Sequence, residues 1–229
     1  GSTWYLLNEP NDANKDKQIF YYRGGGNGYT NTMFWLRTGI GVMKFVHPDD
    51  TNRDEKEEYI RKKAEPAIRY AEILLIYAEA LNELTGNYNI ASWDEETQYT
   101  IQRNIDEMKK GIQPIRIRAG IPDYTRSEYE DQDLFREKLK RERQIELMGE
   151  GHRYYDIRRW KDAEVEESLP IYGCNTLMTE KWRDVFHVPV AIPSLPTNFS
   201  RKMYFWPISH SELKRNKMLT QNPGWTYND

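Results

Sequence analysis

One charged stretch, residues 142–160, constrains the fold of this chain more than any other. Glu142, Glu146 and Glu150 recur every four residues, so they stack on one face if the stretch is helical. Arginines and large apolar residues surround them: Arg143, Arg153, Arg158, Arg159, Ile145, Leu147, Met148, Tyr154, Tyr155, Ile157 and Trp160. A solvated helix does not need so many apolar residues, and a simple core helix does not carry so many charges. The pattern predicts a helix, a break at Gly149 and Gly151, and a second helix, locked by partly buried Arg–Glu pairs that hold geometry.

The overall composition excludes several classes of protein. With 229 residues the chain can form one large domain or two small ones, and its net charge of −3 lacks the basic excess typical of nucleic-acid binding. The single cysteine, Cys174, excludes an intrachain disulfide and a thiol metal cluster. No apolar run approaches the ~20 residues of a membrane span. Residues 1–2, Gly-Ser, are interpreted as an expression scar and the chain as an excised fragment, so missing targeting signals say nothing about location.

The first predicted helix covers residues 66–84. Pro66 suits a first helical position, and Gly86 with Asn87 ends the helix. Its polar residues form one narrow stripe: Glu65, Arg69, Glu72, Glu79 and Glu83. Because nearly every other face is apolar, we expect most of this helix to be buried.

Three further helical segments follow. A capping box, Ser92 to Glu95, predicts a helix to about Lys110 that Gly111 stops, and Pro114 is expected to open a short helical turn. A second capping box at residues 125–128 opens a long, bent helix that reaches Gly149, and the fourth helix covers residues 152–161. Helix pairs with short connections predict a packing similar to tetratricopeptide repeats.

The remaining segments carry little helical period. Residues 3–63 are aromatic and Gly-rich, with possible short strands at 18–23 and within 32–46. Residues 162–204 hold several prolines and form a predicted long loop, a length that is often functional. An apolar extended run at 204–208 and a short capped helix at 209–216 close the chain. The predicted organisation is therefore a single domain over residues 3–229, divided into an irregular region (3–63), a helical core (64–161) and a long loop with a closing segment (162–229).

Several motifs, in this order, resemble those of the SusD/RagB family. They are residues 69–75 and 77–80 (Arg-Tyr-Ala-Glu-Ile-Leu-Leu and Tyr-Ala-Glu-Ala), 115–120 (Ile-Arg-Ile-Arg-Ala-Gly), 142–147, 150–153 (Glu-Gly-His-Arg), 156–160, 206–208 (Trp-Pro-Ile) and 221–225 (Gln-Asn-Pro-Gly-Trp). The matches extend from about Val42 to Trp225 and together are highly specific. Gln113-Pro114 and Lys217 depart from the usual pattern, at helix ends and not at a known chemical site.

The resemblance implies a mainly α SusD-like fold, with tetratricopeptide-like helical pairs, long irregular loops and a few short strands. It also implies a surface lipoprotein of the Bacteroidetes outer membrane that binds glycans or other nutrients and passes them to a SusC-like TonB-dependent porin. Such proteins are not enzymes, and no cofactor is expected. This chain would be the C-terminal part of one, without the lipid-bearing N-terminus and the N-terminal helical repeats. The alternative is a helical-repeat scaffold that binds a protein or peptide and no sugar.

Other chemistry finds weaker support in the sequence. The Gly-rich run at 24–28 lacks the Lys-Ser/Thr of a phosphate loop. His47, His152, His187 and His210 show no paired-ligand spacing, so no metal site is expected, and His152 is interpreted as a hydrogen-bonded member of the Glu–Arg cluster. Cys174 has no neighbouring His to activate it. A hydrolase pair among the glutamates is disfavoured because nearby arginines hold carboxylates ionised.

Sugar binding requires flat aromatic faces with polar side chains beside them. The candidates on predicted loops are Trp4, Tyr5, Tyr22, Tyr29, Trp35, Tyr172 and Trp182. Loops often carry function, although each of these rings could instead pack on the helices. Residues 3–46 are rich in aromatic residues, whereas the later motifs have the pattern of residues that pack in a core. The predicted ligand-binding residues are therefore Tyr22, Tyr29 and Trp35. Residues 162–204 are the alternative location for the ligand-binding surface.

Overall fold

The computed structural model describes residues 21–23, 35–42, 44–45, 47, 51–53, 56–59, 61–64, 66–178, 185–193, 195 and 197–226. The chain divides into two compact units. Residues 63–156 form one, here called the helical unit, and residues 1–62 with 157–229 form the other, here called the loop-rich unit. The predicted irregular N-terminal region and the predicted closing segment thus belong to the same unit. Trp4, Tyr5, Tyr29, Trp182 and the run at 24–28 lie outside the described residues.

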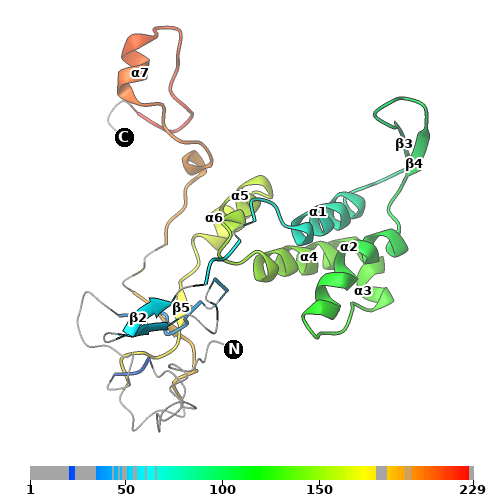
Figure 1. The fold of residues 1–229 in the computed structure, drawn as a ribbon. Helices are drawn as coiled ribbons and strands as arrows, with labels where there is room; N and C mark the ends of the chain where they lie inside the picture. The colour runs from blue at the N-terminus through cyan, green and yellow to red at the C-terminus, as the bar shows by residue number, and fades with distance from the viewer. Residues whose placement is uncertain are drawn as a thin grey trace. The chain divides into compact units, whose positions relative to one another are not determined.

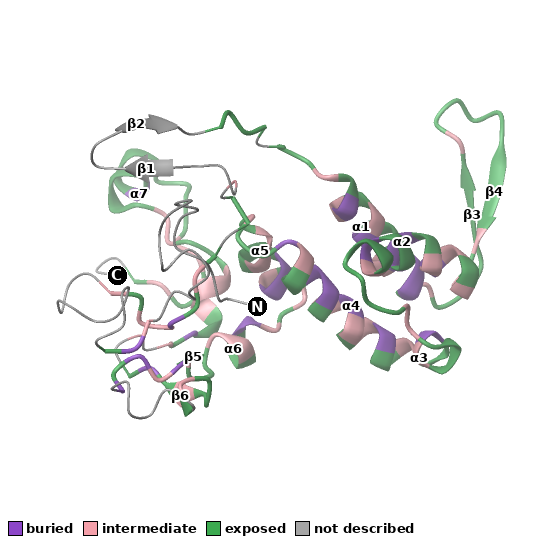
Figure 2. Cartoon of the chain, turned by 60° about the horizontal axis from the view of Figure 1, so that its bottom comes forward, coloured by how far each residue is buried: buried purple, intermediate pink, exposed green. Residues whose placement is uncertain are grey.

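Three helices pack together in the helical unit: α1 (Tyr70–Asn82), α2 (Ile105–Arg118) and α4 (Gln132–Glu146) (Figure 1). The short α3 (Arg126–Glu130) lies beside α4. Their facing sides are apolar, and Figure 2 shows the buried positions gathered between them. The core consists of Ala71, Leu75, Ala78, Leu81, Met108, Ile112, Ile115, Tyr129, Phe135, Leu139 and Leu147. Residues recurring every three or four positions supply it, as expected of amphipathic helices. The prediction that most of α1 is buried is wrong for the side of this helix opposite the core, where Tyr70, Ile73 and Ile76 are exposed.

Helix α2 continues through two residues that the sequence analysis treated as breaks. The predicted stop at Gly111 and new start at Pro114 are wrong, because both residues lie inside α2. A Cβ added at Gly111 would stand 2.4 Å from the Leu74 carbonyl oxygen and 2.8 Å from the Ala78 Cβ, so this glycine lets α1 and α2 approach closely. Pro114 removes one backbone donor, but it is exposed, on a side of the helix where water can replace the lost bond.

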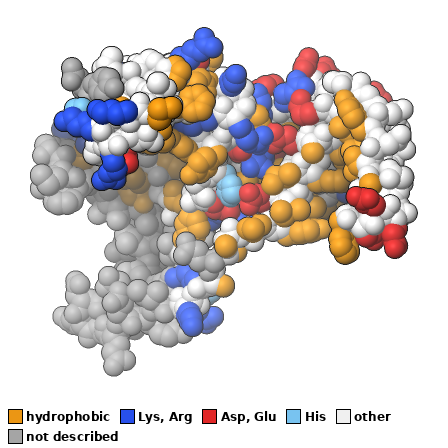
Figure 3. Space-filling model, turned by 90° about the horizontal axis from the view of Figure 1, so that it is seen from above, with side chains coloured by type: hydrophobic (Ala, Val, Ile, Leu, Met, Phe, Trp, Pro, Cys, Tyr) orange, Lys and Arg blue, Asp and Glu red, His pale blue; other side chains and the backbone are white. Residues whose placement is uncertain are grey.

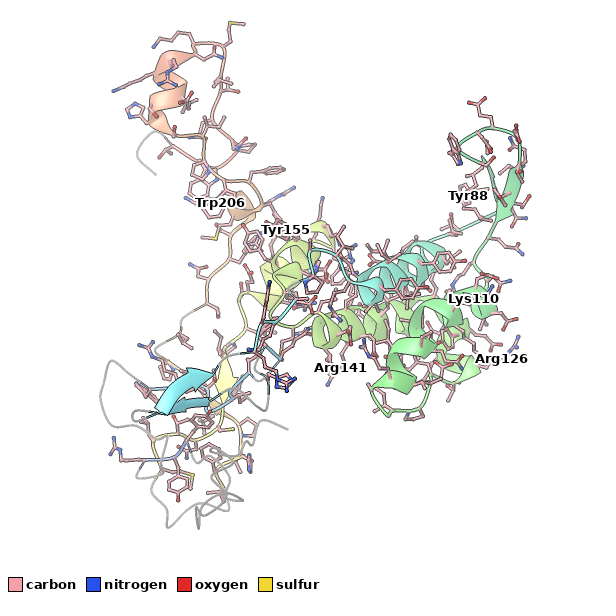
Figure 4. All side chains as sticks on the ribbon, viewed as in Figure 1. Tyr88, Lys110, Arg126, Arg141, Tyr155 and Trp206 are labelled. Atoms are coloured by element: carbon pink, nitrogen blue, oxygen red, sulfur yellow. The ribbon has the colours of Figure 1, made fainter. Side chains whose placement is uncertain are left out.

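A β-hairpin joins α1 to α2 and replaces the first part of the helix predicted from Ser92 to about Lys110. Strands β3 (Tyr88–Ala91) and β4 (Gln98–Ile101) pair antiparallel, with Tyr88 opposite Ile101. Ser92, taken as a helix cap, instead closes the turn: its backbone N–H donates to the Thr97 carbonyl (2.7 Å) and its hydroxyl accepts from the Thr97 N–H (3.0 Å). Both strands are exposed except at Ile101, the half-buried end of β4 (Figure 2), and Tyr88 lies on the hairpin beyond the ends of α1 and α2 (Figure 4).

The stretch at 142–160 folds as a helix, a glycine break and a second helix, which confirms that prediction. Gly149 (φ 79°) and Gly151 (φ 83°) adopt the left-handed conformation that favours glycine, and α5 (His152–Arg159) follows. The predicted long helix at 125–149 is two helices. The Thr125 capping box opens α3, and Asp131 leaves the helical conformation (ψ 109°) to cap α4 through bonds from the Asp133 and Leu134 N–H groups.

The loop-rich unit is built of short elements. They are β1 (Thr51–Arg53), β2 (Lys56–Tyr59), α6 (Ala163–Glu166), β5 (Tyr172–Gly173), β6 (Val190–Ala191), the 3-10 helix η2 (Arg201–Tyr204) and α7 (His210–Arg215). Ile157, Ala163 and Phe199 form a small core with Met203 and Tyr204 packed against it. The predicted capped helix near the end is confirmed as α7, where the Ser209 hydroxyl accepts from the Glu212 N–H. Among the described residues, no helix has the length and apolar character needed to cross a bilayer.

Candidate functional site

The loop-rich unit brings together two segments that lie far apart in the sequence, residues 35–42 and residues 173–178. The Cys174 N–H donates to the Thr38 carbonyl (2.8 Å), and the Thr176 hydroxyl donates to the Arg37 carbonyl (3.4 Å). Gly39 (φ 63°) has no room for a side chain, since a Cβ there would stand 2.8 Å from the Thr176 Cγ2. Two regions considered for ligand binding, the N-terminal aromatic region and the 162–204 segment, therefore share one packed cluster.

Two of the three predicted ligand-binding residues lie in the described part of this cluster. Tyr22 is 5% exposed, and its ring meets Phe186 edge to face at 6.4 Å between centroids. The backbone N–H of Arg23, next along the chain, donates to the Met178 carbonyl (2.9 Å). Trp35 is half-buried, so part of its ring can meet a ligand, whereas the burial of Tyr22 leaves little of its ring accessible. The third, Tyr29, lies outside the described residues.

One further aromatic candidate lies on the same cluster. Tyr172 is exposed and is held by β5, which pairs with β6 through Tyr172 opposite Ala191. A Cβ at the adjacent Gly173 would approach the Thr38 backbone at 2.7 Å, so β5 runs directly beside residues 35–42. The close approach of β5 to residues 35–42 could not be predicted from the sequence. In this cluster, Gly39 and Gly173 lack the side chains that would prevent the close approach.

The glutamates at 142–150 form an ion-pair network in the helical unit. Arg69, which precedes α1, bonds the Glu146 carboxylate (2.8 Å) and the Glu150 carboxylate (2.8 Å). Arg116 in α2 bonds Glu142 at 2.7 Å, and Arg118 bonds Glu146. The expected pairing with arginines of the same stretch is wrong for these contacts, because the glutamate face of α4 is turned toward the start of α1 and the end of α2.

A second ion pair in the unit is almost completely buried. Arg143 of α4 donates to both carboxylate oxygens of Asp156 in α5 (2.9 and 3.1 Å), with the two side chains 4% and 5% exposed. Such bidentate geometry fixes orientation as well as distance. It locks the two helices on either side of the glycine break.

The surroundings of Glu146 suit an ion-pairing role. Burial raises the pKa of the Glu146 carboxyl, but hydrogen bonds from Arg118 and Arg69 together outweigh it, so the pKa lies below its ordinary value. A general acid in glycoside hydrolysis needs the opposite, a raised pKa. His152 Nδ1 stands 3.5 Å from the Glu72 carboxylate of α1, and Glu72 is not one of the three glutamates with which the sequence analysis grouped it. Within the described ranges, no group of three or more His, Cys, Asp or Glu side chains is placed to hold a metal ion. Burial raises the pKa of the Cys174 thiol, which disfavours a nucleophilic thiolate.

Comparison with known proteins decides which family has this arrangement. The family model described as SusD family matches residues 1–225. This chain belongs to the SusD family. The SusD-like chain is 31% identical over 162 residues to "SusD-like protein P2" of Formosa agariphila, an alignment that covers 69% of this chain and 25% of that protein.

Solved structures show the same fold. The SusD-like chain superposes on a structure of selenomethionine BT4246 with a TM-score of 0.67 at 25% identity, covering 82% of this chain and 30% of the other. It superposes on a SusD-like protein from Bacteroides fragilis (BF3747) with a TM-score of 0.51 at 28% identity, covering 69% of this chain and 25% of the other. The mainly helical SusD-like fold is therefore confirmed. The chain spans only about a quarter to a third of the length of these relatives.

Loss of the Glu146 carboxylate is expected to destabilise the SusD-like chain. Glu146→Ala should lower the free energy of unfolding by about 2–3 kcal/mol, below the ~3–5 kcal/mol of a fully buried pair because Arg118 keeps contact with water. Arg126→Ala, which breaks an exposed pair with Glu130, is the matched control and should change it by less than about 0.5 kcal/mol. Urea unfolding measures both. Equal effects of the two substitutions would contradict the structural role of the network.

The same carboxylate predicts a dependence on pH. The pKa of Glu146 is lowered in the folded state. The stability that the ionised Glu146 carboxylate adds to the fold should therefore be fully present above the ordinary pKa of 4.5. It should be lost as pH falls through the lower folded-state pKa. We therefore expect the stability difference between the wild type and Glu146→Gln to be constant from about pH 5 to 8 and to shrink below about pH 4.5. Unfolding curves at stepped pH test this, and a difference that grows on acidification would refute it.

Proposed function

We propose that this chain is part of a protein that binds glycans or other nutrients at the bacterial outer-membrane surface and delivers them to a SusC-like TonB-dependent transporter. The observation that carries the proposal is the family match over residues 1–225. Binding without catalysis fits the helical unit, where Glu142 and Glu146 are held by arginines. A surface lipoprotein location, through a lipid anchor outside this chain, belongs to the same proposal.

The proposed ligand surface lies in the loop-rich unit and includes Tyr22, Tyr29 and Trp35. Apolar C–H faces of pyranose rings pack on aromatic rings, while neighbouring polar groups bond the hydroxyls. Trp35 is the residue that we expect to contribute most, since it is half-buried and is thus less enclosed than Tyr22. The exposed Tyr172, on the segment bonded to residues 35–42, extends the same surface.

The experiment is isothermal calorimetry with a panel of polysaccharides and oligosaccharides. Trp35→Ala should weaken binding by ~1–2 kcal/mol, about 5- to 30-fold, with little change in melting temperature. Trp93→Ala is the matched control, because Trp93 is 96% exposed at the tip of the hairpin in the other unit and should leave affinity unchanged. Tyr22→Ala separates packing from binding, since loss of a buried ring should also lower the melting temperature. Unchanged affinity in Trp35→Ala would contradict the proposed surface.

Two controls test the alternative functions, an enzyme that hydrolyses glycans and a scaffold that binds a protein or peptide. Reducing-end assays with the same polysaccharides should stay at background, and turnover abolished by changing one carboxylate would instead identify an enzyme. If no glycan binds while a protein or peptide does, the helical-repeat scaffold replaces the nutrient-binding proposal.

A further inference from the structure

The end of the chain carries a local excess of positive charge. Residues 201–226, here called the basic segment, contain one acidic residue, Glu212, and five cationic ones: Arg201, Lys202, Lys214, Arg215 and Lys217. With histidine counted as neutral, five positive charges against one negative give the segment a net charge of +4. Because the whole chain carries −3, the residues outside the basic segment carry −7. Charge separated in this way along a chain indicates a negatively charged partner for the segment that differs.

Most of these cations are exposed and are not neutralised by the segment itself. Arg215 pairs with Glu212 at 2.9 Å. Arg201, Lys214 and Lys217 are exposed and form no ion pair with any acidic side chain in the part of the chain that the structure describes. Seen from above the view of Figure 1, Lys and Arg side chains gather over the segment that holds α7 (Figure 3). The basic segment therefore presents a field of one sign to the solvent, which attracts anions.

Hydrogen bonds within the basic segment hold it in one shape. The Gln221 side chain accepts from the Ile208 N–H (2.8 Å) and donates to the Ile208 carbonyl (2.9 Å), which ties the start of α7 to the residues that follow it. The Trp225 Nε1 donates to the Lys202 carbonyl (3.0 Å), and the Lys202 Nζ lies 4.2 Å from the centre of the Trp225 ring. These bonds join η2 to the end of the segment. The cations are thus presented on an ordered scaffold, which lowers the entropic cost of binding.

The surroundings of the cations favour a polysaccharide over a membrane. Helices that lie in a membrane surface are amphipathic, with an apolar face opposite their cations. Helix α7 has no such face, because Leu213 is its one apolar residue and is buried. Phe205 and Trp206, which precede α7, are 63% and 77% exposed and supply flat rings of the kind on which pyranose faces pack.

We propose that the basic segment binds an acidic polysaccharide, with Arg201, Lys214 and Lys217 contacting the carboxylate or sulfate groups of successive sugars. The cations lie on two separate stretches of the segment, so a polymer with repeated charge can meet more of them than a single small anion can. Lys217 is also a position where the chain departs from the usual SusD pattern, so this charge is not part of the motif that defines the family. The inference rests on the proposed nutrient binding and narrows its ligand to glycans that carry negative charge.

Calorimetry with matched pairs of polysaccharides tests the preference for charge. Polygalacturonate and its methyl ester share one backbone with and without carboxylates, and dextran sulfate and dextran do the same for sulfate. The acidic member of at least one pair should bind about tenfold tighter than the neutral member at low salt. The preference should shrink as NaCl is raised from about 50 mM to about 500 mM, because salt screens exposed charges. The pair with the larger preference identifies carboxylate or sulfate as the recognised group.

Charge reversal locates the binding to the basic segment. Lys214→Glu combined with Lys217→Glu should weaken binding of the acidic polysaccharide by about tenfold or more and leave binding of neutral glycans unchanged. Lys110→Glu combined with Arg141→Glu is the matched control, because it makes the same change in net charge at two exposed cations of α2 and α4 (Figure 4). The control should change the affinity by less than about twofold. Melting temperatures show that both double variants fold.

Three other results would overturn the proposal. Equal losses in the two double variants would mean that net charge alone attracts the polysaccharide. Binding of neutral and acidic glycans with the same affinity would overturn this inference and leave the proposed nutrient binding intact, whereas binding of no glycan would overturn both. Binding to vesicles of phosphatidylcholine and phosphatidylglycerol that is lost on reversal of Lys214 and Lys217, with no preference among polysaccharides, would assign the basic segment to a membrane surface.

Discussion

Arg143→Ala is expected to lower the free energy of unfolding by about 3–5 kcal/mol, because it leaves the Asp156 carboxylate buried without the guanidinium that it faces. Both side chains are at least 95% buried, and Arg143 meets both carboxylate oxygens. Asp156→Ala should have a similar effect for the reciprocal reason. Since whole domains are stable by only ~5–15 kcal/mol, either substitution removes a large share of the stability.

A double substitution distinguishes the loss of one partner from the loss of the pair. Replacing Arg143 by Met and Asp156 by Leu together removes both charges and keeps apolar volume, and such replacements of buried pairs are often neutral or stabilising. We expect the double variant to unfold near the wild-type urea midpoint, with each single variant well below it. If the single variants also unfold near the wild-type midpoint, the pair does not lock α4 to α5.

The helical period of the sequence was enough to predict the glutamate face of α4 but not its partners. Glu142, Glu146 and Glu150 lie four apart, and this spacing alone places the first two on one face of a helix. Their partners, Arg69 and Arg116, lie 77 and 26 residues away, and these pairings depend on how α1 and α2 pack. The sequence alone suggested arginines of the same stretch as partners of these glutamates. In the folded chain the glutamates instead pair with arginines that are distant in the sequence.

The capping pattern at residues 92–95 was misleading, because the same residues suit either a helix start or a hairpin turn. Ser92 followed by Glu95 fits a helix cap, yet Ser92 bonds Thr97 across a turn and Glu95 takes a positive φ of 61°. The flanking Tyr, Ile and Thr residues alternate in a way that suits paired strands, and this two-residue period was the signal that could have identified the hairpin. Asn104 is the actual cap of α2, accepting from the Glu107 N–H at 3.1 Å.

The candidate ligand surface was predictable only in part. The aromatic, Gly-rich composition of the N-terminal region predicted Tyr22 and Trp35 as ligand-binding residues. Composition does not reveal which aromatic rings are buried. The contact of residues 35–42 with residues 173–178 spans more than 130 positions of sequence, as in the bond from Thr176 to the Arg37 carbonyl. Contacts between loops this far apart in the sequence depend on the tertiary fold, and no periodic pattern in the sequence indicates them.

Gly111→Ala is expected to lower the free energy of unfolding by about 1–3 kcal/mol through overpacking of α1 against α2. Considered alone, alanine should stabilise the interior of a helix by ~1 kcal/mol relative to glycine. Here the added Cβ would stand 2.4 Å from the Leu74 carbonyl oxygen, a backbone atom of α1 that cannot move without moving that helix. The contact cost therefore exceeds the gain in helix propensity, and Gly111→Val should be worse still.

Gly86→Ala is the matched control, because a Cβ at Gly86 meets nothing within 4 Å. It should leave stability unchanged or raise it slightly, since alanine reduces the freedom of the unfolded chain. Urea unfolding is measured for Gly111→Ala, Gly111→Val and Gly86→Ala, with circular dichroism to confirm native helix content. The comparison separates the cost of overpacking from the gain that alanine brings through the unfolded chain. If Gly111→Ala is as stable as Gly86→Ala, then α1 and α2 do not pack at the separation that the glycine permits, and the same close approach could not hold Arg116 and Arg69 against the glutamates of α4.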